Sequence, residues 1–96
     1  MKMLVIVYSG SHPQRITSLL DRHHAEGYTE FQNAHGVGST GKRDGSRAWP
    51  GDSTFWVSIV PEPRAQELMQ SLREELSGLS VGERVHVAML PTESFF

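Results

Sequence analysis

The sequence contains no cysteine, which excludes a disulfide framework, thiolate chemistry and cysteine-ligated zinc. It also lacks any apolar run approaching the roughly 18 residues that a transmembrane helix needs. Neither positive nor negative residues are in large excess, because the chain has nine Lys and Arg and eleven Asp and Glu, for a formal net charge of −2. Nucleic-acid-binding domains usually carry a basic surface, so we expect no nucleic-acid partner. The apolar stretch near the first residue is too short for a signal peptide, and we therefore expect a cytoplasmic protein.

The composition that remains is that of a small globular domain. The chain has 96 residues, of which 38% are hydrophobic, together with nine glycines. This length and composition predict a single domain over residues 1–96. A domain of this size buries only a modest core, so we expect it to oligomerise.

Hydrophobic periodicity predicts four strands and two helices. Residues 3–8 and 54–60 are apolar runs rich in β-branched and aromatic side chains, which favour strands, and 85–90 is a third such run. Residues 28–35 alternate, which predicts a strand with Phe31, Asn33 and His35 on one side. Apolar residues recur at helical spacing in two segments, one between Ser11 and Gly27 and the other between residue 61 and Gly78.

The predicted order is β-α-β-β-α-β, which is the ferredoxin-like arrangement of the α+β class. In this fold two helices cover one face of a four-stranded antiparallel sheet. The first strand is apolar on both of its sides, so we expect the uncovered face of the sheet to meet another subunit.

Residues 36–53 form an unusually long connection between the second and third strands. An antiparallel hairpin needs only about 2–5 connecting residues, and long loops in compact domains are often functional. This segment contains five glycines and no periodicity, and it concentrates Lys42, Arg43 and Arg47. Trp49 has no obvious packing partner among the small polar residues around it, which predicts docking on a neighbouring subunit or a partner protein.

Three features in this order resemble the PII signalling family and its shorter PII-like relatives. They are Gly27-Tyr28-Thr29 after the first helix, Gly36-Val37-Gly38 at the end of the second strand, and the long loop that follows. The resemblance implies a homotrimer that senses an adenine nucleotide (ATP, ADP or AMP) or another small anion in the cleft between subunits. It further implies that residues 36–53 act as a T-loop-like segment, which signals to a regulated protein such as a transporter or an enzyme.

The resemblance also implies roles for individual residues. Thr29 would lie near the adenine, and Gly36, Val37 and Gly38 would form a backbone wall close to the phosphates, where missing side chains let amides approach an anion. Arg84 stands where the family places a phosphate-binding lysine.

Two other functions stay open at this point. The five histidines form no HxxxH or HExxH pattern, but His35 and His86 are both expected near ends of the sheet, where either could bind a metal ion as in a CutA-like protein. Small ferredoxin-like monooxygenases and isomerases could recruit Asn33 or the same two histidines. No Ser-His-Asp order, paired carboxylate motif or phosphate loop supports catalysis, so we expect a regulatory protein and not an enzyme.

Overall fold

The structure, a computed structural model, describes residues 1–23, 27–34, 37–38, 41–42 and 53–96, with the backbone alone for 37–38, 41–42 and 76. Its elements in chain order are β1 (Lys2–Ser9), α1 (Gln14–Arg22), β2 (Thr29–Ala34), β3 (Val37–Gly38), β4 (Gly41–Lys42), β5 (Ser53–Val60), α2 (Glu62–Leu76) and β6 (Arg84–Pro91).

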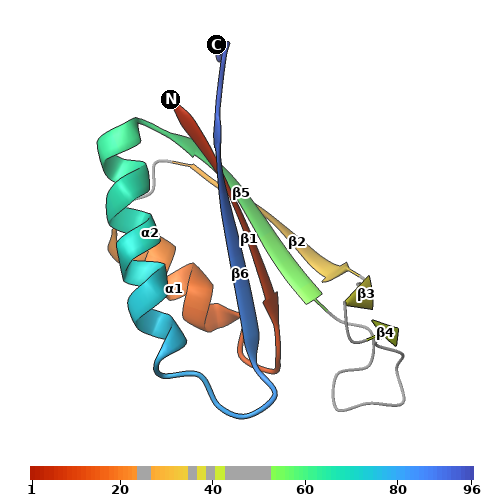
Figure 1. Ribbon diagram of the computed structural model, residues 1–96. Coiled ribbons are helices and arrows are strands. Elements are labelled where there is room, and N and C mark those ends of the chain that lie inside the picture. Colours follow the sequence, from red (N-terminus) through yellow and green to blue (C-terminus); the bar gives the residue numbers. More distant parts are fainter. Residues whose placement is uncertain (24–26, 35–36, 39–40, 43–52) are drawn as a thin grey trace.

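Four long strands form one antiparallel sheet in the order β2-β5-β1-β6 (Figure 1). Both helices lie on the same face of this sheet, and no helix of the described residues covers the opposite face. The arrangement confirms the predicted ferredoxin-like α+β fold.

The core lies between the sheet and the two helices. Because side chains alternate along a strand, β1 and β5 each turn every second residue toward the helices. Trp56 and Tyr8 are the largest fully buried side chains of this layer. The helices contribute one apolar stripe each, and the fully buried residues of the stripes are Ile16, Leu19, Leu20, Ala65, Leu68 and Leu72.

Prolines mark the start of both helices. Pro13 precedes α1 with helical dihedral angles, while Pro61 precedes α2 and Pro63 lies in its first turn. Proline suits these positions because the first backbone N–H groups of a helix have no acceptor within the helix. Neither described helix has the length and hydropathy of a membrane-spanning segment.

Two local features were not predicted from the sequence. The register of β2 against β5 shifts between Phe31 and Ala34, and Asn33 adopts a φ of 59°. Asparagine tolerates this left-handed conformation, and the resulting bulge breaks the predicted alternation beyond Phe31. The long connection after β2, which shows no periodicity in the sequence, begins with a short β3–β4 ladder in which Val37 pairs with Lys42.

Candidate functional site

The uncovered side of the sheet, which we call the open face, is mainly apolar, with polar residues at its ends. Its residues alternate with the core residues along each strand and are half-buried or exposed in the isolated chain. Phe31 and Phe55 stack on it with ring centroids 4.5 Å apart, and Phe31 remains 45% exposed. A continuous apolar surface of this kind is typical of an interaction site. The open face comprises Met3, Val5, Val7, Thr29, Phe31, Phe55, Val57, Ile59, His86, Ala88 and Leu90, and Ser9, Ser53 and Arg84 continue it at one end.

Thr29 lies in a cavity of about 490 Å³ at one end of the open face, which we call the Thr29 cavity. The volume is within the range of small-molecule sites. The strands contribute Val57 and Ile59 to it, and the loop before β2 contributes Gly27 and Tyr28. Met1 and Phe95 complete the lining.

Glu30 holds the start of β2, and therefore Thr29, against the rest of the molecule. Its carboxylate accepts hydrogen bonds from Thr17 Oγ1 at 3.1 Å, Trp56 Nε1 at 3.0 Å and Gln32 Nε2 at 2.6 Å. The bonds from Gln32, and then those from Thr17 and Trp56, hold the pKa of Glu30 below its usual value, against the opposing effect of burial. One carboxylate thus joins α1, β2 and β5 beside the cavity.

At the opposite end of the sheet, the turn before β6 is bound to β1 by the side chain of Glu83. Glu83 accepts hydrogen bonds from the Tyr8 hydroxyl and from the backbone N–H of Ser80, the latter at 2.7 Å. The turn closes by a bond from Glu83 N to Ser80 O, with Gly82 at a φ of 95°, as the third residue of a type II turn requires.

The hydrogen bond between Tyr8 and Glu83 shifts the pKa values of the two groups in opposite directions. It is the main cause that holds the pKa of Glu83 below its usual value, and the Ser80 amide adds to the effect. Burial, and then the same hydrogen bond, raises the pKa of Tyr8. Gly10 leaves room for this pair, because a Cβ atom there would lie 2.5 Å from Tyr8 Oη.

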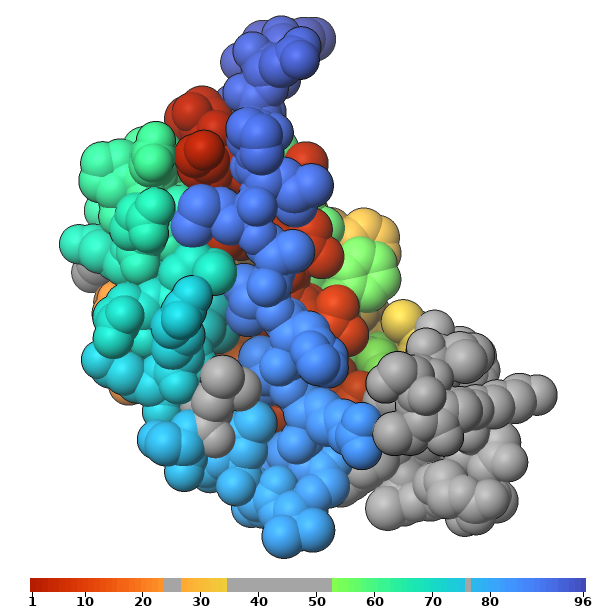
Figure 2. All heavy atoms as spheres, viewed as in Figure 1, coloured from red at the N-terminus to blue at the C-terminus, as the bar shows by residue number. Residues whose placement is uncertain are grey.

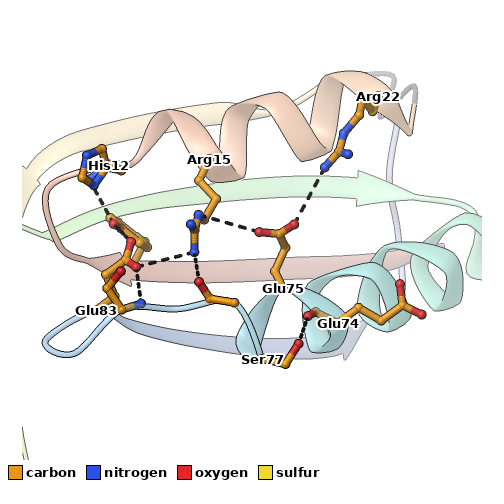
Figure 3. Close-up of polar contacts among 10 residues, drawn as sticks. His12, Arg15, Arg22, Glu74, Glu75, Ser77 and Glu83 are labelled. Carbon is orange, nitrogen blue, oxygen red and sulfur yellow. Dashed lines mark hydrogen bonds and ion pairs between the residues drawn. The ribbon is translucent and has the colours of Figure 1, made fainter.

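Arg15 extends the contact from the turn to both helices (Figure 3). From α1 it donates to the carbonyl oxygen of Gly78 at 3.0 Å and lies 3.5 Å from Glu83 and 3.8 Å from Glu75. Arg22 approaches the other oxygen of Glu75 at 3.9 Å. The turn that leads into Arg84 is therefore fixed from β1, α1 and α2.

The structure separates the expected binding residues within one chain. Thr29 is on the edge strand β2 and Arg84 begins the other edge strand, with β5 and β1 between them. Thr29 pairs with Val57, which pairs with Val5, which pairs with Ala88 on β6. Ala88 is four residues beyond Arg84. Strand spacing then places the two residues about 14 Å apart across the sheet and about 13 Å along it.

Some of the other residues to which roles were assigned are described by the structure, and some are not. The backbones of Val37 and Gly38 form β3 and that of Lys42 is in β4. Five residues to which roles were assigned lie outside the described residues, namely His35, Gly36, Arg43, Arg47 and Trp49.

A metal site gains no support from the part of the chain that the structure describes. His86 is on the open face opposite Val7, and no group of three or more potential ligands occurs among the described residues. A site that uses His35 falls outside this range.

Sequence reasoning missed Tyr8, Arg15 and Glu83, which join the turn before β6 to the body of the protein. The acid before Arg84 was visible, but no local pattern indicates a partner 75 residues away. Phe95 was also missed, because it lies beyond the last periodic segment.

Solved structures of PII-like proteins have the same fold as this chain at low sequence identity. The nitrogen regulatory PII-like protein CPII from Thiomonas intermedia K12, bound to ADP, AMP and bicarbonate, is 28% identical with a TM-score of 0.65, covering 93% of this chain and 86% of that one. The structure of CPII bound to ADP and bicarbonate is 29% identical with a TM-score of 0.64, and it covers the same shares of the two chains. The chain folds like a PII-like protein.

A second PII-like protein supports the same conclusion. The PII-like signalling protein from Thermus thermophilus is 29% identical with a TM-score of 0.62, covering 93% of this chain and 85% of that one. No protein-family model matches the chain, and neither does the sequence of any curated protein. The resemblance to PII-like proteins that the glycine and threonine positions indicated is confirmed by the fold.

Proposed function

We propose that this protein is a homotrimeric PII-like regulatory protein that binds an adenine nucleotide between its subunits. Residues 36–53 would transmit the state of this site to a regulated protein. The observation that carries the proposal is the similarity over 93% of the chain to a PII-like protein bound to ADP, AMP and bicarbonate. A nucleotide, alone or with a small anion, is therefore the first ligand to test.

The separation of Thr29 from Arg84 supports a site shared between copies. The two residues are roughly 20 Å apart in one chain, by the spacing of residues and strands in the sheet. An arginine from a neighbouring copy can meet the phosphates of a nucleotide held near Thr29, whereas the arginine of the same chain is on the wrong edge. The site is incomplete in a monomer.

The open face supports the same assembly. Its half-buried strands present Met3, Val5 and Val7 beside Val57 and Ile59, a surface that other copies would remove from water. Closed symmetric assembly is the usual way in which small domains bury such a surface.

Light scattering and calorimetry on the purified protein test the proposal together. We expect a trimer, and heat of binding with at least one of ATP, ADP, AMP and cyclic AMP, measured with and without bicarbonate. A stable monomer that binds none of them would contradict the proposal. Chromatography of the ligand after incubation should return it unchanged, because a sensor binds without turnover, and conversion would favour the alternative of a small ferredoxin-like enzyme.

Replacing Arg84 by Ala should weaken nucleotide binding. Loss of a charge-assisted contact to a phosphate costs about 1.5–3 kcal/mol, which is about a ten- to hundredfold loss of affinity. Arg73→Ala on α2 removes the same charge from the helical side of the molecule and is the matched control. Equal affinities for the two variants would remove Arg84 from the site.

A further inference from the structure

The Thr29 cavity is walled in part by the segment that follows β6. The backbone N–H of Thr92 donates to the carbonyl oxygen of Met1 at 3.2 Å, which ties the beginning of this segment to the start of β1. The segment then projects beyond the sheet (Figure 2), and Phe95 lines the cavity. Phe95 is 56% exposed, so much of its surface is uncovered.

The chemistry of the lining favours an uncharged planar group. The ionisable groups of the seven lining residues are the α-amino group of Met1 and the phenol of Tyr28, whose hydroxyl donates to Asp21 at 3.0 Å, and no lining side chain is a carboxylate, lysine, arginine or histidine. Val57 and Ile59 present branched apolar side chains from the sheet, and the Thr29 hydroxyl supplies a polar group. Such a lining suits the face of a heteroaromatic ring and one hydrogen bond at its edge.

We propose that Phe95 is the aromatic wall against which the purine ring of a bound adenine nucleotide stacks. This inference rests on the proposed function and adds the residue that recognises the ring. Every nucleobase offers a π-face to an aromatic side chain, and stacking of this kind contributes measurably to binding. The phosphates would extend away from the apolar side chains of Val57 and Ile59, since the lining offers them no arginine or lysine side chain.

Phe96 provides the matched control within the same segment. It is the adjacent residue and of the same type, yet it is fully exposed and does not line the cavity. Truncating either ring removes the same number of atoms from the protein. A difference in ligand affinity between the two variants therefore reports the position of the ring and not the apolar character of the segment.

Calorimetric titration of the full chain with ADP tests the inference. Phe95→Ala should weaken binding by about 5- to 150-fold, the effect of losing one stacked aromatic side chain. Phe96→Ala should bind like the wild type, and Phe95→Tyr should retain most of the affinity because its ring also stacks. Light scattering should give the same oligomeric state for all four proteins.

Proton NMR of ADP gives an independent readout. Stacking on Phe95 should shift the adenine H2 and H8 resonances upfield in the wild type and in Phe96→Ala, and the shift should be lost in Phe95→Ala. If the wild type binds ADP while Phe95→Ala binds equally well, or Phe96→Ala loses as much affinity, the role of Phe95 is overturned and the proposed function stands. If the wild type binds no adenine nucleotide, both are overturned.

Discussion

Glu83 illustrates how much the role of a residue depends on what folding brings to it. In the sequence it is an acid beside an arginine, whereas in the structure its side chain is only 4% exposed and accepts bonds from Tyr8 and Ser80. Arg15 stands 3.5 Å away. Each of these partners stabilises the charged form, so the carboxylate fixes the turn before Arg84 only while it is ionised.

We expect Glu83→Gln to destabilise the protein by about 1.5–3 kcal/mol near neutral pH, because bonds to an ionised group are replaced by weaker ones. The pKa of Glu83 is lowered below its ordinary value of 4.5 by folding. As the pH falls past 4.5, the folded state binds fewer protons than the unfolded state. The contribution of Glu83 to the free energy of unfolding is therefore fully present above pH 4.5 and is lost as the pH falls through the lowered pKa. The difference in unfolding free energy between wild type and variant, measured in urea, should shrink accordingly.

Glu93→Gln is the control for this comparison, because Glu93 is exposed on the segment after β6. It should unfold like the wild type over the same pH range. A penalty for Glu83→Gln that stays constant from neutral pH to about pH 3 would mean that packing, and not the charge, fixes the turn.

Single elements could be predicted from the sequence where their signal is local. β1 and β5 are apolar runs of strand length rich in β-branched and aromatic residues, and the stripe of α2 repeats at the helical period. The bulge at Asn33 has no such signal, since it depends on how β2 meets β5. The β3–β4 ladder of two residues per strand is too short to show a period.

The site was less predictable than the elements for the same reason. Thr29 could be placed by its short motif, and it does line a cavity. The groups that line this cavity together with Thr29 come from distant parts of the chain, namely Met1, Val57 and Phe95. Tertiary packing brings these three residues together, and a sequence pattern within one segment does not show which distant segments pack against it.

Hydrogen exchange in the segment after β2 tests whether this segment responds to the bound ligand. If residues 36–53 report the occupied site, binding of ADP should slow hydrogen exchange of the backbone amides in this range. Its five glycines make ordering costly, at about 1–2 kcal/mol per residue fixed, so the ligand must supply that free energy. Amides of β5, which are paired on both sides in the sheet, serve as the internal reference. Identical exchange in 36–53 with and without ADP would exclude the proposed signalling.

At the scale of the whole molecule, the two faces of the sheet have different surroundings. One is covered by α1 and α2, and its residues form the core. The other has equally apolar strands at its centre but no covering element within the described part of the chain. A domain of 96 residues gains much of its stability from the apolar surface that it buries, so association of several copies would add a second core.

Placing a charge at the centre of the open face should therefore dissociate the protein without unfolding it. Val5 lies on β1 between Val57 and Ala88, and a glutamate there would be buried without a partner in an assembly but solvated in a monomer. Light scattering should give the mass of one chain, 10.7 kDa, for Val5→Glu and three times that mass for the wild type. Ser18→Glu adds the same charge on an exposed position of α1 and should remain assembled. Because Arg84 would then come from no neighbour, the Val5→Glu monomer should also lose affinity for ADP, and a monomer that keeps full affinity would show that the site is complete within one chain.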